Sequence, residues 1–76
     1  MKTVNILINT VDKVKSFVRD ITRFEYEFDL VSGKYVVNAK SIMGVFSLDI
    51  GKPICLQINT EDSTEEIMNV LSAYIV

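Results

Sequence analysis

The sequence predicts a two-layer α+β fold in which helices cover one face of a four-stranded sheet. Three observations lead to this prediction. Four segments carry the apolar patterns of strands, three carry capped helical patterns, and together they follow the order β-α-β-β-α-β-α. Polar side chains alternate with apolar ones in the strand segments, so the other face of the sheet is expected to contact solvent.

The first strand is predicted over residues 2–9, because Val4, Ile6 and Ile8 alternate with polar residues. Leu7 interrupts this alternation, which indicates that it packs at an edge of the sheet or at an interface.

The first helix is predicted to follow Thr10, whose side-chain oxygen is suited to cap it. Asp12 near its start and Arg23 near its end both suit the helix dipole. Apolar residues recur at helical spacing and mark the side that is expected to be buried: Val11, Val14, Phe17, Val18 and Ile21.

The next two strands are predicted to form a hairpin over residues 24–31 and 35–39. Its turn is expected at Ser32-Gly33, because glycine can supply the positive φ of a tight turn. Apolar residues of the first of these strands alternate with three acidic residues: Glu25, Glu27 and Asp29.

Three elements complete the chain. A short helix is predicted over residues 41–48 with Ser41 as its N-cap, and the fourth strand is marked by Ile54, Leu56 and Ile58. The last helix is expected to begin near residues 62–64. Its capping box would be Ser63 and Glu66, and its buried residues would be Ile67, Val70, Leu71 and Tyr74.

Composition narrows the classes of function. The 76 residues, with net charge −2, predict a single domain over 1–76. One cysteine excludes an intramolecular disulfide, and the absence of histidine excludes histidine metal sites, histidine bases and phosphohistidine. No apolar run approaches the ~18 residues of a membrane span, and no basic patch favours nucleic acid. We therefore expect a cytoplasmic protein that contacts neither membrane nor nucleic acid directly.

One local motif carries a resemblance to a known family. Gly33-Lys34, followed by the run from Asn38 to Leu48, resembles the regulatory-serine segment of HPr, the small phosphocarrier of the bacterial sugar phosphotransferase system. Lys40-Ser41-Ile42-Met43-Gly44 is its most specific part. The resemblance implies an open-faced antiparallel sandwich with strand order 1-4-2-3.

The chain departs from this family at the phosphocarrier site. Counting back from Ser41 without gaps places the family's phosphorylated histidine on Thr10. Val11-Asp12-Lys13 then replace the family's Ala-Arg-Pro, so Asp12 puts a negative charge where an arginine would balance the phosphate. Phosphorelay through a histidine is therefore impossible, and the chain resembles the histidine-less paralogue that acts in catabolite repression.

Ser41 has two interpretations. It is a helix cap by residue type, and by resemblance it is a regulatory phosphorylation site. The resemblance implies HPr kinase/phosphorylase and a carbon-control transcription regulator as protein partners. It also implies a docking patch at the matching residues, although the apolar ones could instead belong to the core: Lys40, Ile42, Met43, Phe46 and Leu48.

Two other groups are expected to be passive. The three acidic residues Glu25, Glu27 and Asp29 share a strand face, but they lack the loop and carbonyl ligands of a calcium site, so a solvated face is favoured. Cys55 has no histidine to activate it and is expected to be a partly exposed thiol. We expect no metal, no cofactor and no enzymatic activity.

Three hypotheses for function remain. The leading one is a regulatory protein that acts through phosphorylation of Ser41 and partner docking. The second is a structural or assembly module that keeps the fold as a scaffold and pairs through its first strand or the short-helix patch. The third is a phosphocarrier, which would have to use the hydroxyl of Thr10 or Ser41.

Overall fold

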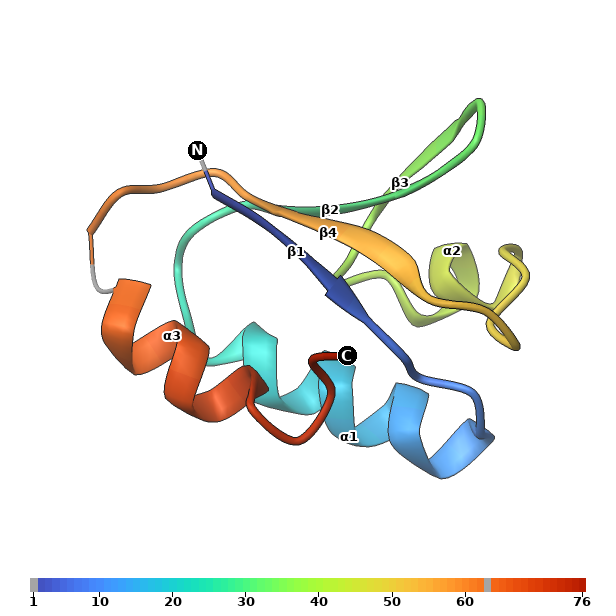
Figure 1. Cartoon of the computed structure of the whole chain (residues 1–76), viewed down its shortest axis with the longest axis horizontal. Helices are drawn as coiled ribbons and strands as arrows, with labels where there is room; N and C mark the ends of the chain where they lie inside the picture. Colours follow the sequence, from blue (N-terminus) through green and yellow to red (C-terminus); the bar gives the residue numbers. More distant parts are fainter. Residues whose placement is uncertain (1, 63) are drawn as a thin grey trace.

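The computed structural model describes residues 2–62 and 64–76. Four strands and three helices follow one another in the predicted order (Figure 1). Their bounds are β1 Lys2–Ile6, α1 Val11–Thr22, β2 Phe28–Ser32, β3 Tyr35–Asn38, α2 Ile42–Phe46, β4 Ile54–Ile58 and α3 Thr64–Leu71.

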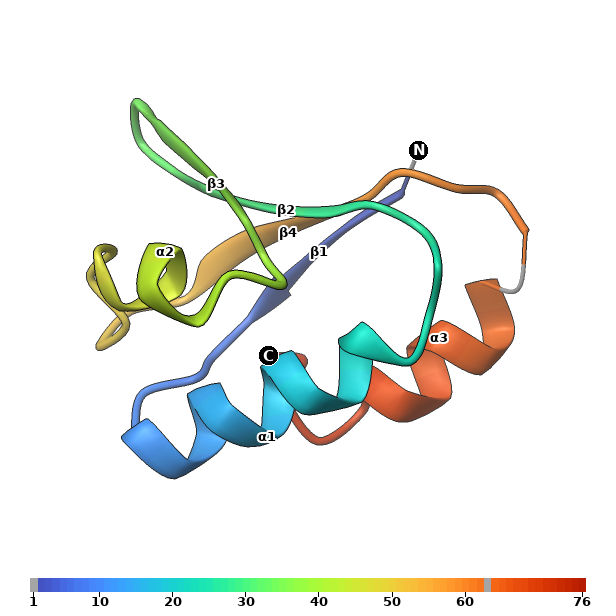
Figure 2. The ribbon, with the colours of Figure 1, turned by 180° about the vertical axis from the view of Figure 1, so that it is seen from behind.

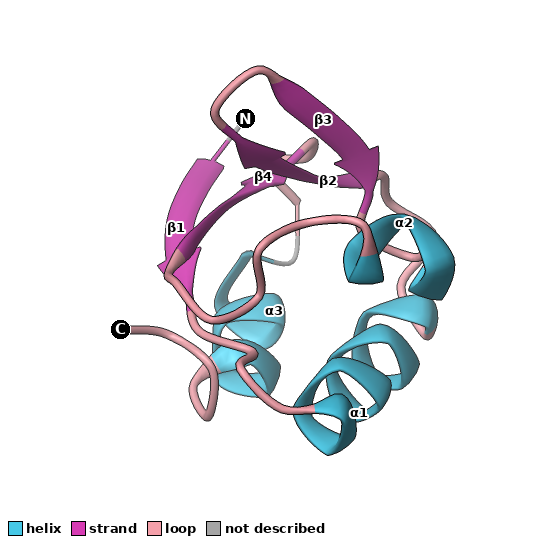
Figure 3. Ribbon diagram, turned by 90° about the vertical axis from the view of Figure 1, so that its right-hand side faces the viewer, coloured by secondary structure: helices cyan, strands magenta, loops and turns pink. Residues whose placement is uncertain are grey.

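The strands form one antiparallel sheet in the order β1-β4-β2-β3. Leu56 of β4 lies between Val4 of β1 and Leu30 of β2, and Leu30 in turn pairs with Val37 of β3. All three helices lie on the same side of the sheet, as the opposite views of Figures 1 and 2 and the end view of Figure 3 show. The fold class and the strand order predicted from the resemblance are confirmed.

The core lies between the sheet and the helices. Each strand turns alternate residues toward the helices, which is why Ile54, Leu56 and Ile58 are buried while Cys55 and Gln57 between them are not. The helices contribute buried residues at helical spacing: Val14, Phe17 and Ile21 from α1, and Ile67 and Leu71 from α3.

The hairpin between β2 and β3 contains the predicted glycine turn, but its two turn residues are Gly33 and Lys34 rather than Ser32 and Gly33. Ser32 pairs with Tyr35, so two residues form the turn, and Gly33 has φ of +58°. An L-residue rarely adopts this conformation, whereas glycine does so without a steric cost.

Several predicted boundaries are wrong. The short helix predicted over residues 41–48 ends at Phe46, and the strand predicted over 35–39 ends at Asn38. The second strand begins at Phe28 rather than at residue 24, because Phe28 pairs with Ile58, the last residue of β4. Beyond this pair a single backbone hydrogen bond, from Asn59 to the Glu27 carbonyl at 3.0 Å, continues the contact. The first strand ends at Ile6 rather than at residue 9, although Ile8 is still buried.

The C-terminal residues occupy the edge of the sheet next to Leu7. The backbone N–H of Leu7 donates to the carbonyl of Tyr74 at 2.8 Å, and Ile6 forms an isolated bridge with Ile75. Leu7 is partly buried, so the interruption in the sequence pattern does mark an edge of the sheet.

The predicted buried faces of the helices are confirmed only in part, since Val18 is only partly buried. Val11 is exposed because it is the first residue of α1, one turn before the buried residues begin. Val70 is only partly buried, whereas Tyr74 is buried. The predicted cap Ser63 lies outside the described residues. Within residues 2–62 and 64–76, the helices are too short and too polar to cross a membrane.

Candidate functional site

Ser41 lies where the chain passes from β3 into α2. Its side-chain oxygen accepts a hydrogen bond from the backbone N–H of Gly44 at 3.2 Å, and its carbonyl accepts one from Val45 at 2.9 Å. The backbone of Ser41 is extended, with φ −92° and ψ 106°, as is typical of an N-cap. The predicted cap is confirmed, and the residue is exposed.

Gly44 makes close packing around Ser41 possible. A Cβ atom at this position would lie 3.3 Å from the Ser41 Oγ and 3.4 Å from the Cβ of Val37 on β3. The absence of a side chain therefore lets the start of α2 lie against both the cap and β3.

An apolar surface adjoins Ser41. Ile42, Met43 and Phe46 on α2 are 36%, 77% and 38% exposed, and we call these three residues the α2 surface. A helix of five residues cannot bury all of its sides, and here Val45 alone points fully into the core. Large apolar side chains that stay exposed together are typical of binding surfaces.

Leu48 does not belong to this surface. Only 8% of it is exposed, and it packs in the core with the buried residues of the sheet and the helices. The expectation that it contacts a partner is therefore wrong, because two residues past the end of α2 the chain turns back toward the core.

Lys40 is also directed into the molecule. Its ammonium group donates a hydrogen bond to the carbonyl of Phe24 and lies 5.6 Å from the centre of the Phe28 ring. The lysine thus connects the start of α2 to the segment after α1, and its charge faces inward rather than toward the α2 surface.

Thr10 caps α1 in the same manner as Ser41 caps α2. Its Oγ1 accepts a hydrogen bond from the backbone N–H of Lys13 at 3.1 Å. Asp12 is exposed in the first turn of α1, where a carboxylate suits the helix dipole, and the Lys13 ammonium lies 3.4 Å from the Asn9 side-chain oxygen.

The acidic residues do not share a strand face. Glu25 and Glu27 lie before β2 and are exposed, whereas Asp29 lies within β2 and accepts a hydrogen bond from Asn59 at 2.9 Å. Among residues 2–62 and 64–76, no three acidic or cysteine side chains come together as a metal site would require. Cys55 is a free, half-buried thiol on β4.

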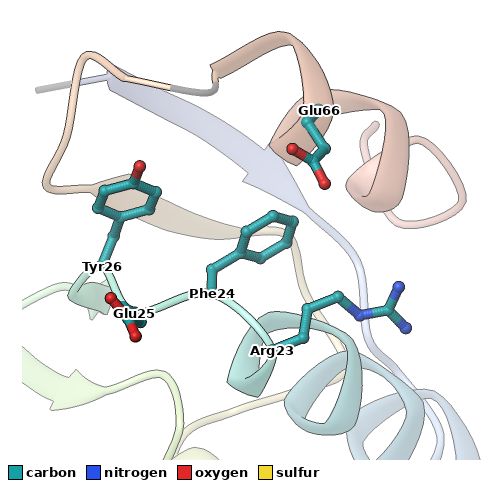
Figure 4. A pocket seen from close by; sticks show the side chains of 5 residues that line it. All are labelled: Arg23, Phe24, Glu25, Tyr26 and Glu66. Carbon is teal, nitrogen blue, oxygen red and sulfur yellow. The ribbon is translucent and has the colours of Figure 1, made fainter.

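A pocket that the sequence did not predict lies beside segment 23–27 (Figure 4). It measures about 280 Å³ and is lined by Arg23, Phe24, Glu25, Tyr26 and Glu66. Figure 4 shows the Phe24 ring pointing from this segment toward α3, the helix that carries Glu66, with Tyr26 farther along the segment. The alternation of apolar and polar residues predicted that both aromatic residues belong to a strand, so the pocket was not expected. Phe24 and Tyr26 lie between α1 and β2, and a connection of this kind is where a pocket could have been predicted.

Tyr74, near the C-terminus, contacts two residues of α1. Its hydroxyl donates to Asp20 at 2.8 Å, and its ring meets that of Phe17 edge-on at 5.6 Å. Burial raises the pKa of Tyr74 above its ordinary value, and the hydrogen bond to Asp20 raises it further.

The family is decided by comparison with known proteins. The family model described as "PTS HPr component phosphorylation site" matches residues 12–76, a range that contains Ser41 and the whole α2 surface. The chain belongs to the HPr family. The match to HPr begins two residues after Thr10.

Relatives of known sequence or structure agree with this membership. The HPr-like protein Crh of Halalkalibacterium halodurans is 42% identical over 60 residues, which cover 78% of this chain and 71% of Crh. Among solved structures, HPr-C-His from Thermoanaerobacter tengcongensis is 29% identical with a TM-score of 0.78, covering 95% of this chain and 89% of that one. The phosphocarrier HPr of Bacillus anthracis str. Ames is 27% identical with a TM-score of 0.74, covering 96% and 93%. This HPr-family chain is thus related to the phosphotransferase system and similar to Crh.

Proposed function

We propose that this chain is a regulatory member of the HPr family that is switched by phosphorylation of Ser41 and binds protein partners through the α2 surface. One observation carries the proposal. In a family member that contains no histidine, an exposed serine hydroxyl lies beside three exposed apolar side chains. We further propose that it acts by binding, without cofactor or catalysis, as a single cytoplasmic domain.

The residue content argues against a phosphocarrier. A phosphohistidine relay needs an imidazole, and the 76 residues include none. A relay through Thr10 would need a base to activate its hydroxyl. That hydroxyl oxygen instead accepts the capping bond of α1, and the nearby Asp12 would repel an incoming phosphate.

The surroundings of Ser41 are compatible with a phosphate. A phosphoserine carries about −1.5 to −2 charges, and the first turn of α2 contains no acidic residue that would oppose them. Phosphate oxygens can also accept the bond from Gly44 that the hydroxyl accepts now. The modification would therefore change the charge beside the α2 surface while α2 stays folded.

The partners that we propose follow from the family. HPr kinase/phosphorylase would transfer the phosphate from ATP to Ser41, and a carbon-control regulator would bind the product. Large and adaptable side chains such as Phe46 and Met43 suit such a contact. The competing function, an assembly module, predicts binding that is independent of Ser41 phosphorylation.

The experiment that tests the switch is intact-mass spectrometry after incubation with HPr kinase/phosphorylase and ATP. Ser41→Ala is compared with Ser47→Ala, a matched control because Ser47 is an exposed serine at the other end of α2. We expect one phosphate on the wild type and on Ser47→Ala, and none on Ser41→Ala. Phosphate that persists on Ser41→Ala would refute the assignment.

Docking is tested separately, with the phosphorylated protein and a purified carbon-control regulator in calorimetric titrations. Met43→Ala and Phe46→Ala are each expected to weaken binding by about fivefold or more, the effect of a typical energetic anchor. Val76→Ala removes an exposed apolar side chain far along the chain and is expected to change nothing. Equal binding affinity of the wild type and all three variants would show that the α2 surface does not contact the regulator.

A further inference from the structure

The two edges of the sheet differ in how their backbone groups are hydrogen-bonded. At the β1 edge, the C-terminal residues supply a cover, because Leu7 donates to the Tyr74 carbonyl at 2.8 Å and Val76 donates to the Asn5 carbonyl at 3.1 Å. At the other edge, β3 is the last strand in the order β1-β4-β2-β3, and no strand within residues 2–62 and 64–76 pairs with its outer side. At the end of β3 the Asn38 carbonyl accepts a hydrogen bond from Ser41 at 3.0 Å, so the open part of the edge is centred on Val36.

The backbone of Val36 faces this open edge. Ala39, directly after β3, donates its N–H to the Phe28 carbonyl at 2.8 Å, on the side of β2. Residues of an antiparallel strand alternate in the direction of their hydrogen bonds, so Tyr35 and Val37 also bond toward β2. The N–H and C=O of Val36 therefore point away from the sheet.

The side chains at this edge are apolar and exposed. Tyr35 is 70% and Val36 is 62% exposed, and β3 contains neither a charged residue nor a proline. Natural proteins usually protect an edge strand with such residues, because a bare apolar edge is a template for another strand. Figures 1 and 2 show that the tip of the β2–β3 hairpin extends away from the helices.

We propose that two copies of this chain pair through their β3 strands, antiparallel about a twofold axis at Val36, to form one continuous eight-stranded sheet. In this register Val36 lies opposite Val36 of the second copy, and each donates its N–H to the other's carbonyl. Tyr35 lies opposite Val37 of the second copy, an aromatic–β-branched pair of the kind that stabilises sheets.

Charge and size set the strength of this pairing. The register places Lys34 opposite Asn38 of the second copy, so the two lysines do not face each other. A strand of four residues buries less than the roughly 1,200 Å² of a stable interface, so the dimer is weak and forms only at high concentration. This pairing uses neither Ser41 nor the β1 edge and holds whether or not the proposed switch exists.

Sedimentation equilibrium of the purified wild type, Val36→Pro and Val36→Thr tests the proposal. Proline removes the outward N–H without touching a bond to β2, whereas threonine keeps the N–H and the branched shape. We expect a reversible dimer for the wild type and Val36→Thr. For Val36→Pro we expect the dissociation constant to rise by about tenfold or more, because symmetry removes two hydrogen bonds at once. A wild type that stays monomeric up to millimolar concentration would overturn the proposal.

Hydrogen exchange of the wild type gives an answer that does not depend on the proline variant folding. Protection of the Val36 amide is expected to increase with protein concentration. The amide of Thr3, on the outer side of β1 beyond the C-terminal cover, is expected not to change. Concentration-dependent protection of Thr3 in place of Val36 would show that copies pair through β1 and would contradict the proposal.

Discussion

Lys40 joins three parts of the chain through one residue. Its ammonium group reaches the carbonyl of Phe24 and the ring of Phe28, and its backbone N–H donates to the Asn38 side chain at 2.9 Å. The sequence motif placed Lys40 in a docking patch, because lysines are mostly exposed and a motif does not show where a side chain points. Only the contacts of its ammonium group with Phe24 and Phe28 reveal its inward direction.

Replacing Lys40 by methionine tests this anchoring role. We expect Lys40→Met to lower the free energy of unfolding by about 1–3 kcal/mol, because it leaves the Phe24 carbonyl without its charged donor. Lys34→Met is the matched control at an exposed lysine, with an expected change within about 0.5 kcal/mol. Urea denaturation measures both, and equal stability of the two variants would contradict the role.

The buried hydroxyl of Tyr74 makes the stability of the protein depend on pH. Tyr74→Phe loses the hydrogen bond to Asp20, so we expect it to be less stable than the wild type by about 0.5–1.5 kcal/mol below pH 10. The pKa of Tyr74 is raised in the folded state, so above pH 10 the unfolded chain releases this proton while the folded protein keeps it. The wild type then loses stability with rising pH.

Urea denaturation of the wild type and Tyr74→Phe on both sides of pH 10 measures this effect. The difference in unfolding free energy between the two proteins is expected to narrow as the pH rises past 10. A difference that grows with pH would mean that the folded state favours the ionised phenol, which the burial of Tyr74 opposes.

At the scale of elements, the sequence predicts most of what the structure contains, and its errors lie where an element needs a partner. Alternation continues from Phe24 to Leu30, but alternation alone cannot distinguish a strand from an extended segment. The second strand starts only at Phe28 because β4 ends at Ile58, and this limit depends on residues that are distant in the sequence. The two helix caps Thr10 and Ser41 are local features, and both were predicted correctly.

The end of α2 offers a test at this scale. Leu48→Ala is expected to lower the free energy of unfolding by about 2–5 kcal/mol, because Leu48 is buried in the core. Met43→Ala, five residues earlier on the α2 surface, is expected to change it by less than about 0.5 kcal/mol. Chemical denaturation monitored by circular dichroism distinguishes the two variants. A Leu48→Ala variant as stable as Met43→Ala would contradict the role of Leu48 in the core.

At the scale of the whole molecule, pattern alone did not determine the arrangement of the strands. Four strands in this order allow several antiparallel sheets, and the order β1-β4-β2-β3 followed from the resemblance around Lys40-Ser41-Ile42-Met43-Gly44. The cover over β1 and the pocket at Phe24 were not foreseen, because both join segments that are far apart in the chain. The absence of histidine from the 76 residues, by contrast, can be read directly from the sequence.

We propose that this HPr-family chain is modified at Ser41 and does not relay phosphate. The most direct test is the intact mass of the wild-type protein after two parallel reactions, one with HPr kinase/phosphorylase and ATP, the other with enzyme I and phosphoenolpyruvate. We predict one added phosphate in the first reaction and none in the second. A phosphate acquired from enzyme I and phosphoenolpyruvate, with none from the kinase, would contradict the account.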